Sequence, residues 1–256
     1  MSRFASLEFE HESHDDSRSD VVKDEKYYLA EANWAYERAD FEQALRHFSK
    51  VLEFNPQQAA AWTGQVRALI DLGEYREAKL WADKALEHFP REPELLAAKA
   101  VALGRCGDLE GAMAFSDASI EERGDTPYIW LARGDVLLAR AEHRADYCFE
   151  KALMLAPRDW FTAWLAARVR FFYRQFALAL KLLLSALEWD PCQGVLWLQA
   201  GLCQQQLGLL GAARQSLGRA LEIHPRWPSA EKALLEIDRA GPLTRLAGGF
   251  RNLFRK

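Results

Sequence analysis

The sequence predicts an all-α solenoid of about six helix-turn-helix hairpins that ends in a C-terminal capping helix. Three observations lead to this prediction, because prolines, tryptophans and alanines each recur along the chain at a spacing close to 34 residues. A repeat of this length is typical of solenoids. One helical hairpin cannot bury its apolar stripe alone, whereas stacked hairpins bury a continuous core.

The prolines mark the end of each repeat. Each stands at the end of a similar short stretch of sequence, and these prolines are Pro56, Pro90, Pro157, Pro191 and Pro225. Their spacings are 34, 67, 34 and 34, and 67 is 34 plus 33. One repeat therefore lacks its proline. We expect it to close near Gly124, with the proline arriving late as Pro127.

Two further residue types keep the same spacing. Trp62 and Trp197 each follow a closing proline by six residues, Trp164 follows one by seven, and Trp130 holds the corresponding place after the closure without a proline. A small residue recurs midway through each second helix, at Ala44, Ala78, Ala112, Ala145, Ala179 and Ala213. These alanines let neighbouring helices approach closely, and the tryptophans fill the gaps between hairpins.

This pattern of Trp, small residue and closing Pro over residues 25–225 resembles the tetratricopeptide-repeat family. The resemblance implies a right-handed superhelix whose first helices line a concave face, where ligands bind. The expected pairs of helices are 25–38 and 41–54, 58–72 and 75–88, 93–105 and 108–122, 127–140 and 143–155, 159–173 and 175–188, and 193–207 and 210–223. Gly73, Gly107 and Gly208 fall in the turns inside hairpins.

The ends of the chain differ from the repeats. We expect an acidic, disordered segment over 1–24, the solenoid with its capping helix over 25–240, and a basic tail over 241–256. The capping helix begins at Pro228 and runs to Ala240. Repeats four and five each shift one residue from the inner turn to the linker, which predicts a local change of superhelical pitch between residues 125 and 175.

Composition argues against several classes of function. The net charge of −4 and the pI of about 5.9 do not provide the basic surface of a nucleic-acid-binding protein. The four cysteines form no Cys-x-x-Cys pair, so neither a zinc site nor a disulfide framework is expected. There is no phosphate-binding loop and no catalytic motif, so we expect no metal, no cofactor and no enzymatic activity. Without a signal peptide or an apolar run of eighteen residues, the expected location is the cytoplasm.

The stripes that face the predicted groove change character along the chain. In repeats one and two the stripe is polar, whereas in repeats five and six it is apolar and aromatic, with Leu198 and Leu202 expected to be exposed. One interpretation is packing within a tightly wound superhelix. The other is a groove for an apolar peptide or amphipathic helix. The candidate groove residues are Asn33, Tyr36, Arg67, Leu165, Val169, Phe172, Tyr173, Leu198, Leu202 and Gln205.

Some members of the family hold the C-terminal carboxylate of a chaperone with a clamp of Lys, Asn and Arg residues on three successive repeats. Only Asn33 matches that pattern here, because Leu29, Gly64, Glu94 and Ala98 occupy the other four positions. Partners of that class are therefore not expected.

The tail carries six apolar residues on one helical face, from Leu243 to Phe254, and its only charges are positive. A basic amphipathic helix is typical of a membrane-surface or partner-docking element. A capping helix folded back on repeat six is the third interpretation. The candidate docking residues are Arg245, Phe250, Arg251, Phe254 and Arg255.

Together these observations predict a protein-interaction scaffold that binds a peptide or helix of a partner protein in its concave groove. The alternative is a peripheral scaffold anchored through its basic tail at the inner face of a membrane. No nucleic-acid partner is expected. The pattern leaves self-association open, and it does not identify the partner.

Overall fold

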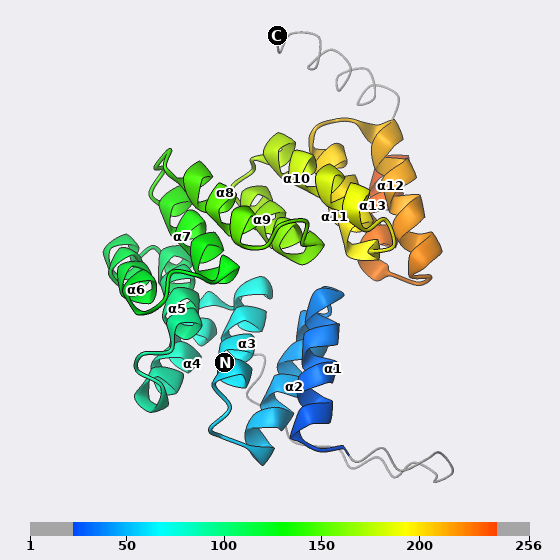
Figure 1. Ribbon diagram of the computed structural model, residues 1–256. Coiled ribbons are helices and arrows are strands. Elements are labelled where there is room, and N and C mark those ends of the chain that lie inside the picture. The colour runs from blue at the N-terminus through cyan, green and yellow to red at the C-terminus, as the bar shows by residue number, and fades with distance from the viewer. Residues whose placement is uncertain (1–22, 240–256) are drawn as a thin grey trace.

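The computed structural model describes residues 23–239, and over these residues the chain is an all-α solenoid of thirteen helices without strands (Figure 1). Twelve of the helices form six consecutive hairpins. Their bounds are Glu25–Glu37 (α1) and Phe41–Phe54 (α2), Ala59–Asp71 (α3) and Tyr75–His88 (α4), Pro93–Cys106 (α5) and Leu109–Glu122 (α6), Pro127–Ala139 (α7) and Ala145–Leu155 (α8), Trp160–Phe172 (α9) and Phe176–Trp189 (α10), and Gly194–Gln206 (α11) and Leu210–Ile223 (α12).

The turns inside the hairpins share one backbone conformation. Gly73, Gly107 and Gly208 have positive φ angles of 82°, 92° and 78°, as the predicted turn positions require. Ala39, Ala141 and Arg174 occupy the same place in the other three hairpins, with φ between 57° and 60°. A side chain in this left-handed region costs about 1 kcal/mol, so these three turns are strained relative to the glycine turns.

The recurring alanines lie at the centre of the helical stack. All six of them are buried, so each marks a close approach between helices. The tryptophans contribute a repeated hydrogen bond as well as bulk. The indole Nε1–H of Trp62 donates to the carbonyl of Pro56 at 2.9 Å, and Trp130 and Trp197 make the equivalent bonds to Gly124 and Pro191 at 2.8 Å. The bond ties α3, α7 and α11 to the end of the preceding repeat.

Repeat five departs from this scheme at its tryptophan. Trp164, which lies one residue later after its proline, is buried between the rings of Phe41 and Phe161, at centroid distances of 6.3 and 5.7 Å. Phe41 opens α2 of the first repeat. The shift of one residue thus turns Trp164 toward a distant part of the chain.

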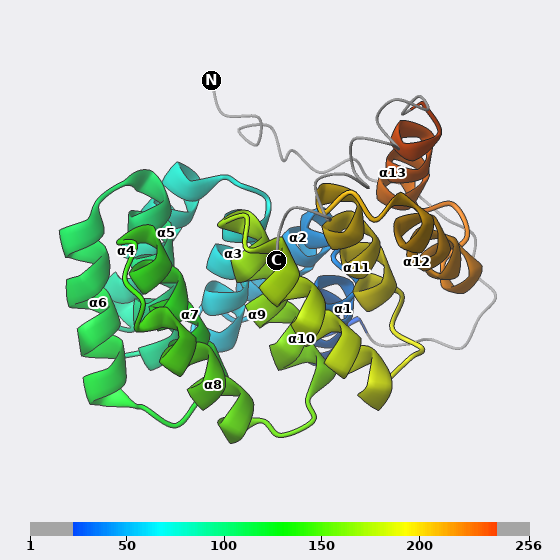
Figure 2. The ribbon, with the colours of Figure 1, turned by 90° about the horizontal axis from the view of Figure 1, so that it is seen from above.

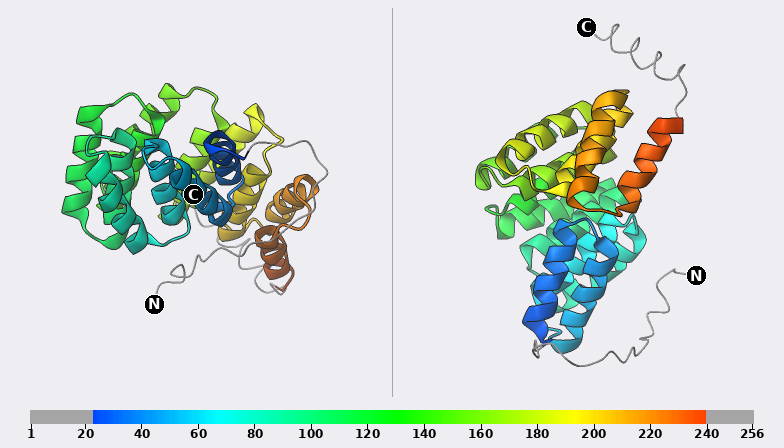
Figure 3. Two further views of the ribbon diagram at one scale, coloured as in Figure 1. Left: turned by 90° about the horizontal axis from the view of Figure 1, so that it is seen from below. Right: turned by 90° about the vertical axis from the view of Figure 1, so that its right-hand side faces the viewer.

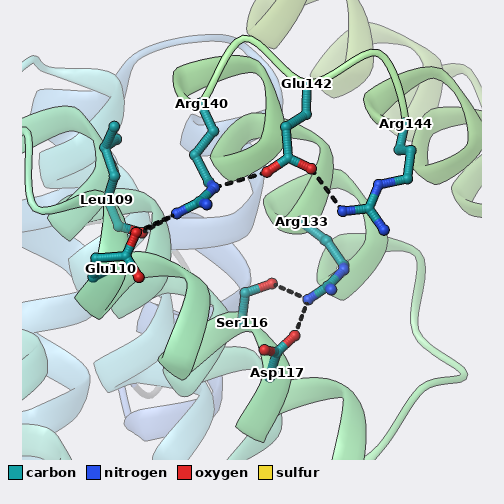
Figure 4. Close-up of polar contacts among 8 residues, drawn as sticks. All are labelled: Leu109, Glu110, Ser116, Asp117, Arg133, Arg140, Glu142 and Arg144. Carbon is teal, nitrogen blue, oxygen red and sulfur yellow. Dashed lines mark hydrogen bonds and ion pairs between the residues drawn. The ribbon is translucent and has the colours of Figure 1, made fainter.

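Charged residues connect repeats three and four at the surface (Figure 4). Arg140 donates to Glu110 and to Glu142, both at 2.8 Å, and Arg144 donates to the second oxygen of Glu142 at 2.7 Å. Arg133 of α7 reaches back to Asp117 of α6. Such exposed pairs contribute about 0–1 kcal/mol each. They hold the α7–α8 loop, beside the short helix α8, against the preceding repeat. The change of superhelical pitch predicted for residues 125–175 stays a prediction.

The solenoid winds so far round that the start of the chain comes back to its end, where the turn after α1 meets the segment after α12 (Figures 1 and 2). Arg168 of α9 donates to Asp71 at the end of α3 at 2.8 and 3.2 Å, across 97 residues of sequence. Arg38, just after α1, contacts the imidazole of His224, just after α12, at 2.7 Å. We call this meeting of the first two repeats with the last two the closure.

The predicted capping helix is present as α13, Pro228–Arg239 (Figure 3). Its buried residues Ala230, Ala233 and Ile237 cover Ala213 and Leu217 of α12. This packing shields the apolar end of the sixth hairpin from water. Residues 1–22 and 240–256 lie outside the described part of the chain, so the predicted boundaries at 24/25 and 240/241 stay predictions.

Candidate functional site

The first helices of the hairpins line the inside of the superhelix. Residues of α1, α3, α5, α7 and α9, with Tyr75 from α4, surround a small central cavity of about 120 Å³. This places the inner wall where the repeat pattern predicts it. The closure narrows the interior, and two grooves lie beside this cavity, each sharing two lining residues with it.

Two carboxylates organise the central cavity, and each is already bound. Asp71 accepts hydrogen bonds from the phenol of Tyr36 and the guanidinium of Arg168. Asp135 accepts two from Arg105, at 2.6 and 3.0 Å, and one from Tyr173 at 2.8 Å. Burial, reinforced by these carboxylates, raises the pKa of Tyr36 and of Tyr173, so both phenols remain protonated donors.

Arg67 is the cation of this cluster that pairs with a carboxylate only at long range. Its guanidinium lies 3.9 Å from the ring centroid of Tyr128 and 5.2 Å from that of Tyr36. Its Nε is buried and has no hydrogen-bond partner among residues 23–239. Glu94 forms a long ion pair with Arg67, 3.9 Å from Nη1, which is beyond hydrogen-bonding distance. Arg67 is therefore held mainly by ring contacts.

An N-terminal groove of about 500 Å³ lies beside Arg67, between α1, α3 and α5, with Phe161 of α9 at its side. Asn33 and Thr63 contribute polar groups, and Glu37, Glu92 and Glu94 contribute carboxylates. Burial raises the pKa of Glu37 and of Glu92, and a neighbouring carboxylate adds to the effect in each case. The groove is acidic at its rim and has one cation inside.

A C-terminal groove of about 570 Å³ lies between α9, the start of α10 and α11. Its apolar lining consists of Phe171, Phe172, Phe176 and Leu202, and its polar lining consists of Arg168, Arg174, Gln199 and Gln206. Phe172 is 46% exposed, although the guanidinium of Arg105 lies 3.2 Å from its ring centroid on the other side. The side chain of Arg174 makes no hydrogen bond or ion pair with any described residue.

The ten candidate groove residues therefore do not form one surface. Asn33 is exposed in the N-terminal groove, Tyr36 and Arg67 line both that groove and the central cavity, and Leu165 and Val169 line the cavity alone. Phe172 lines both the central cavity and the C-terminal groove, and Leu202 lines that groove. Tyr173 donates to Asp135, and Gln205 donates to Glu236 of α13 at 3.2 Å.

One expectation about exposure is wrong. Leu198 is only 7% exposed, because it packs in the cluster that joins α11, α12 and α13. The other leucine of that stripe, Leu202, is partly exposed. In the apolar stripe of repeat six, Leu198 thus belongs to the core and Leu202 to the groove. The stripe has features of both interpretations, packing within the superhelix and a groove for a ligand.

Sequence reasoning missed the Arg105–Asp135 pair, whose side chains are 7% and 4% exposed. A signal was present, because Asp71, Arg105 and Tyr173 keep the repeat spacing of 34 residues and its double, 68. Polar residues that recur at the same position of each repeat face the same side of the inner wall.

The tail residues Arg245, Phe250, Arg251, Phe254 and Arg255 lie outside the described residues.

Residues 23–239 hold no group of three or more His, Cys, Asp or Glu side chains arranged to bind a metal ion. Within the same residues no helix has the length and apolar character needed to cross a bilayer.

Comparison with known proteins agrees with this geometry. The family model described as "Tetratricopeptide repeat" matches residues 35–102. BBSome complex member BBS4 of Bos taurus is 23% identical over 210 residues, which are 82% of this chain and 38% of that protein. Protein CTR9 homolog of Arabidopsis thaliana is 35% identical over 101 residues, 39% of this chain and 9% of that protein. The chain thus spans well under half the length of these relatives.

Among solved structures, a thermophilic tetratricopeptide-repeat protein of Thermus thermophilus superposes with a TM-score of 0.55 at 22% identity. The match covers 71% of this chain and 99% of that one. At this identity the likeness establishes the shared fold.

Proposed function

We propose that this chain, which belongs to the tetratricopeptide-repeat family, is a non-enzymatic scaffold that captures a segment of a partner protein on its inner face. The observation that supports the proposal most directly is the C-terminal groove, where Phe172 is nearly half exposed beside Phe176 and Leu202. Aromatic side chains that remain exposed in a concave site are typical anchors of protein interfaces.

The charges of the C-terminal groove indicate what kind of segment fits it. Arg174 is at the rim with no partner among the described residues, and Gln199 and Gln206 offer amide groups. An apolar side chain of the ligand would lie on Phe172 and Leu202, and a neighbouring carboxylate would pair with Arg174. The proposed ligand is therefore an acidic peptide or helix with one apolar anchor, bound by the helix-in-groove mode.

Selection from a random peptide library tests this proposal without a known partner. Wild-type protein should enrich peptides that combine an apolar residue with nearby Asp or Glu, and Phe172→Ala should lose the enrichment. A hot-spot aromatic contributes about 2 kcal/mol or more, which corresponds to roughly thirtyfold in Kd. Arg174→Glu should shift the selected peptides from acidic to basic.

Leu80→Ala is the matched control, because Leu80 is a large exposed apolar side chain on a second helix, outside the groove. It should select the same peptides as the wild type. Enrichment of acidic peptides that survives both Phe172→Ala and Arg174→Glu would place the binding surface elsewhere. Circular dichroism melts of each variant separate loss of binding from loss of fold.

The second candidate function is a peripheral scaffold anchored by the tail at the inner face of a membrane. It depends on the sequence of residues 241–256, which combines an apolar face with four positive charges and no acidic residue. The two candidates are compatible, because the inner grooves would remain available to a partner while the tail is bound.

A further inference from the structure

Helix α10 carries more apolar surface than its own hairpin uses. Its inward face, with Ala179, Leu183 and Ala186, is fully buried in the solenoid. Yet Leu178 and Leu184 on the outward side are 45% and 46% exposed. In Figure 2 this helix lies with α6 and α8 on the outer side of the first helices. Neither exposed leucine lines either of the inner grooves.

The outward face of α10 also has an ordered pattern of charge. Ala177, Lys181, Leu184 and Glu188 are all exposed, and their spacings of four, three and four residues place them on one stripe. Lys181 and Glu188 are seven residues apart, which is two helical turns or about 10.5 Å. Neither side chain forms a hydrogen bond or ion pair with another described residue.

We propose that α10 pairs antiparallel with α10 of a second copy of this chain, about a two-fold axis that passes beside Leu184 and Ser185. In that arrangement the numbers of any two facing residues sum to 369. Lys181 therefore faces Glu188 of the partner subunit, and Leu184 faces Ser185 of the partner subunit. The ion pair occurs twice, as a two-fold interface requires. The small side chain of Ser185 lets the two leucines approach the axis closely.

The charge pattern selects this occupant over the others. A stripe with a cation and an anion placed symmetrically about an apolar centre is complementary to itself when reversed. A bilayer surface would instead be opposed by Glu188, whose carboxylate belongs to the same stripe. An unrelated partner would require no such symmetry. This interface goes beyond the proposed function, since it uses the outer face and leaves the peptide grooves free.

Sedimentation equilibrium of the full chain provides the test, because a dimer doubles the mass of the 29.2 kDa chain. Wild-type protein should dimerise. Lys181→Glu places two acids opposite each other, and Glu188→Lys places two bases opposite each other, so each single variant should weaken the dimer by about tenfold or more. The double variant Lys181→Glu with Glu188→Lys restores both pairs and should dimerise within about threefold of the wild type.

Mixing the two single variants gives the sharpest result. One variant has an all-acidic stripe and the other an all-basic stripe, so the mixture should form a heterodimer more tightly than either variant pairs with itself. Leu80→Asp, at an exposed leucine on α4, is the control and should leave dimerisation unchanged. A wild type that stays monomeric at about 100 μM, where a Kd of micromolar order would give dimer, overturns the proposal. So do single variants that dimerise as the wild type does, or a mixture that gains nothing.

Discussion

Arg168 in the fifth repeat hydrogen-bonds Asp71 in the second, through both Nε and Nη2. The two residues are 97 positions apart, and the phenol of Tyr36 from the first repeat donates to the same carboxylate. Three repeats thus meet at one acidic side chain. This contact explains why the inner face is divided into a cavity and two grooves, because the wall of repeat five lies against repeats one and two.

Asp71→Ala should therefore destabilise the protein by about 2 kcal/mol. Removing one member of a buried ion pair costs about 3–5 kcal/mol, and we expect less here because both side chains are about one-fifth exposed. Urea unfolding measures the loss, and small-angle scattering should show a larger radius of gyration. If Asp71→Ala costs no more than Glu222→Gln, which breaks the exposed pair with Arg219, the closure contributes nothing to stability.

Gly73→Ala should lower the free energy of unfolding by about 1 kcal/mol, because an alanine is strained at a φ of 82°. No atom lies within 4 Å of the added Cβ, so the loss reports the backbone conformation alone. Gly218→Ala is the matched control, since it too meets open space but lies inside helix α12. It should raise stability by about 0.5–1 kcal/mol. Equal effects of the two variants, measured by thermal melts, would contradict the role of the turn.

Stability should fall as the pH drops from about 7.5 to 5.5, in part because of His224. Burial lowers the pKa of His224, and the neighbouring Arg38 lowers it further. The unfolded chain then binds more protons than the folded chain around the ordinary pKa of histidine, so acid favours unfolding. His224→Gln should reduce the pH dependence of the urea midpoint. Arg38→Gln, which removes only the neighbouring cation, should reduce it less; an unchanged slope in His224→Gln would contradict the assignment.

Binding to anionic vesicles should depend on the tail and should be sensitive to salt. Each basic residue near an anionic surface contributes about 1 kcal/mol, and the apolar face adds shallow burial. Phe250→Glu should reduce flotation with vesicles sharply, whereas neutral vesicles should bind little of either form. If deletion of 241–256 lowers the melting temperature and neither form floats, the tail is a structural cap and the membrane alternative is wrong.

The periodic features of the sequence predicted the helices closely. The expected ranges 41–54, 75–88 and 210–223 coincide with α2, α4 and α12, and the other helix ends differ by at most two residues. These boundaries depend on local chemistry, such as the side chain of Asp40 that caps α2 and the left-handed turn at Gly73. Local signals of this kind are visible in a single sequence.

The closure and the division of the inner face could not be predicted in this way. The position at which repeat five meets repeat one depends on small rotations that accumulate over every intervening hairpin. For the same reason the sequence did not show how far each residue would be exposed: Leu165 and Phe172 both line the central cavity, but Leu165 is buried and Phe172 is half exposed. The local sequence pattern shows which face of its helix a residue occupies. It does not show which distant part of the chain packs against that face.

The closure should also change how the protein unfolds. In an open array of repeats each unit touches only its sequence neighbours, so the stability is nearly a one-dimensional sum and the ends fray first. Here α1 is held by α9 through Tyr36 and Phe161, whose ring centroids are 6.2 Å apart, and the segment after it is held by His224. The terminal repeats consequently have neighbours on both sides, as members of a ring do. The array should therefore lose its free ends as starting points for melting and unfold with higher cooperativity than its number of repeats alone would give.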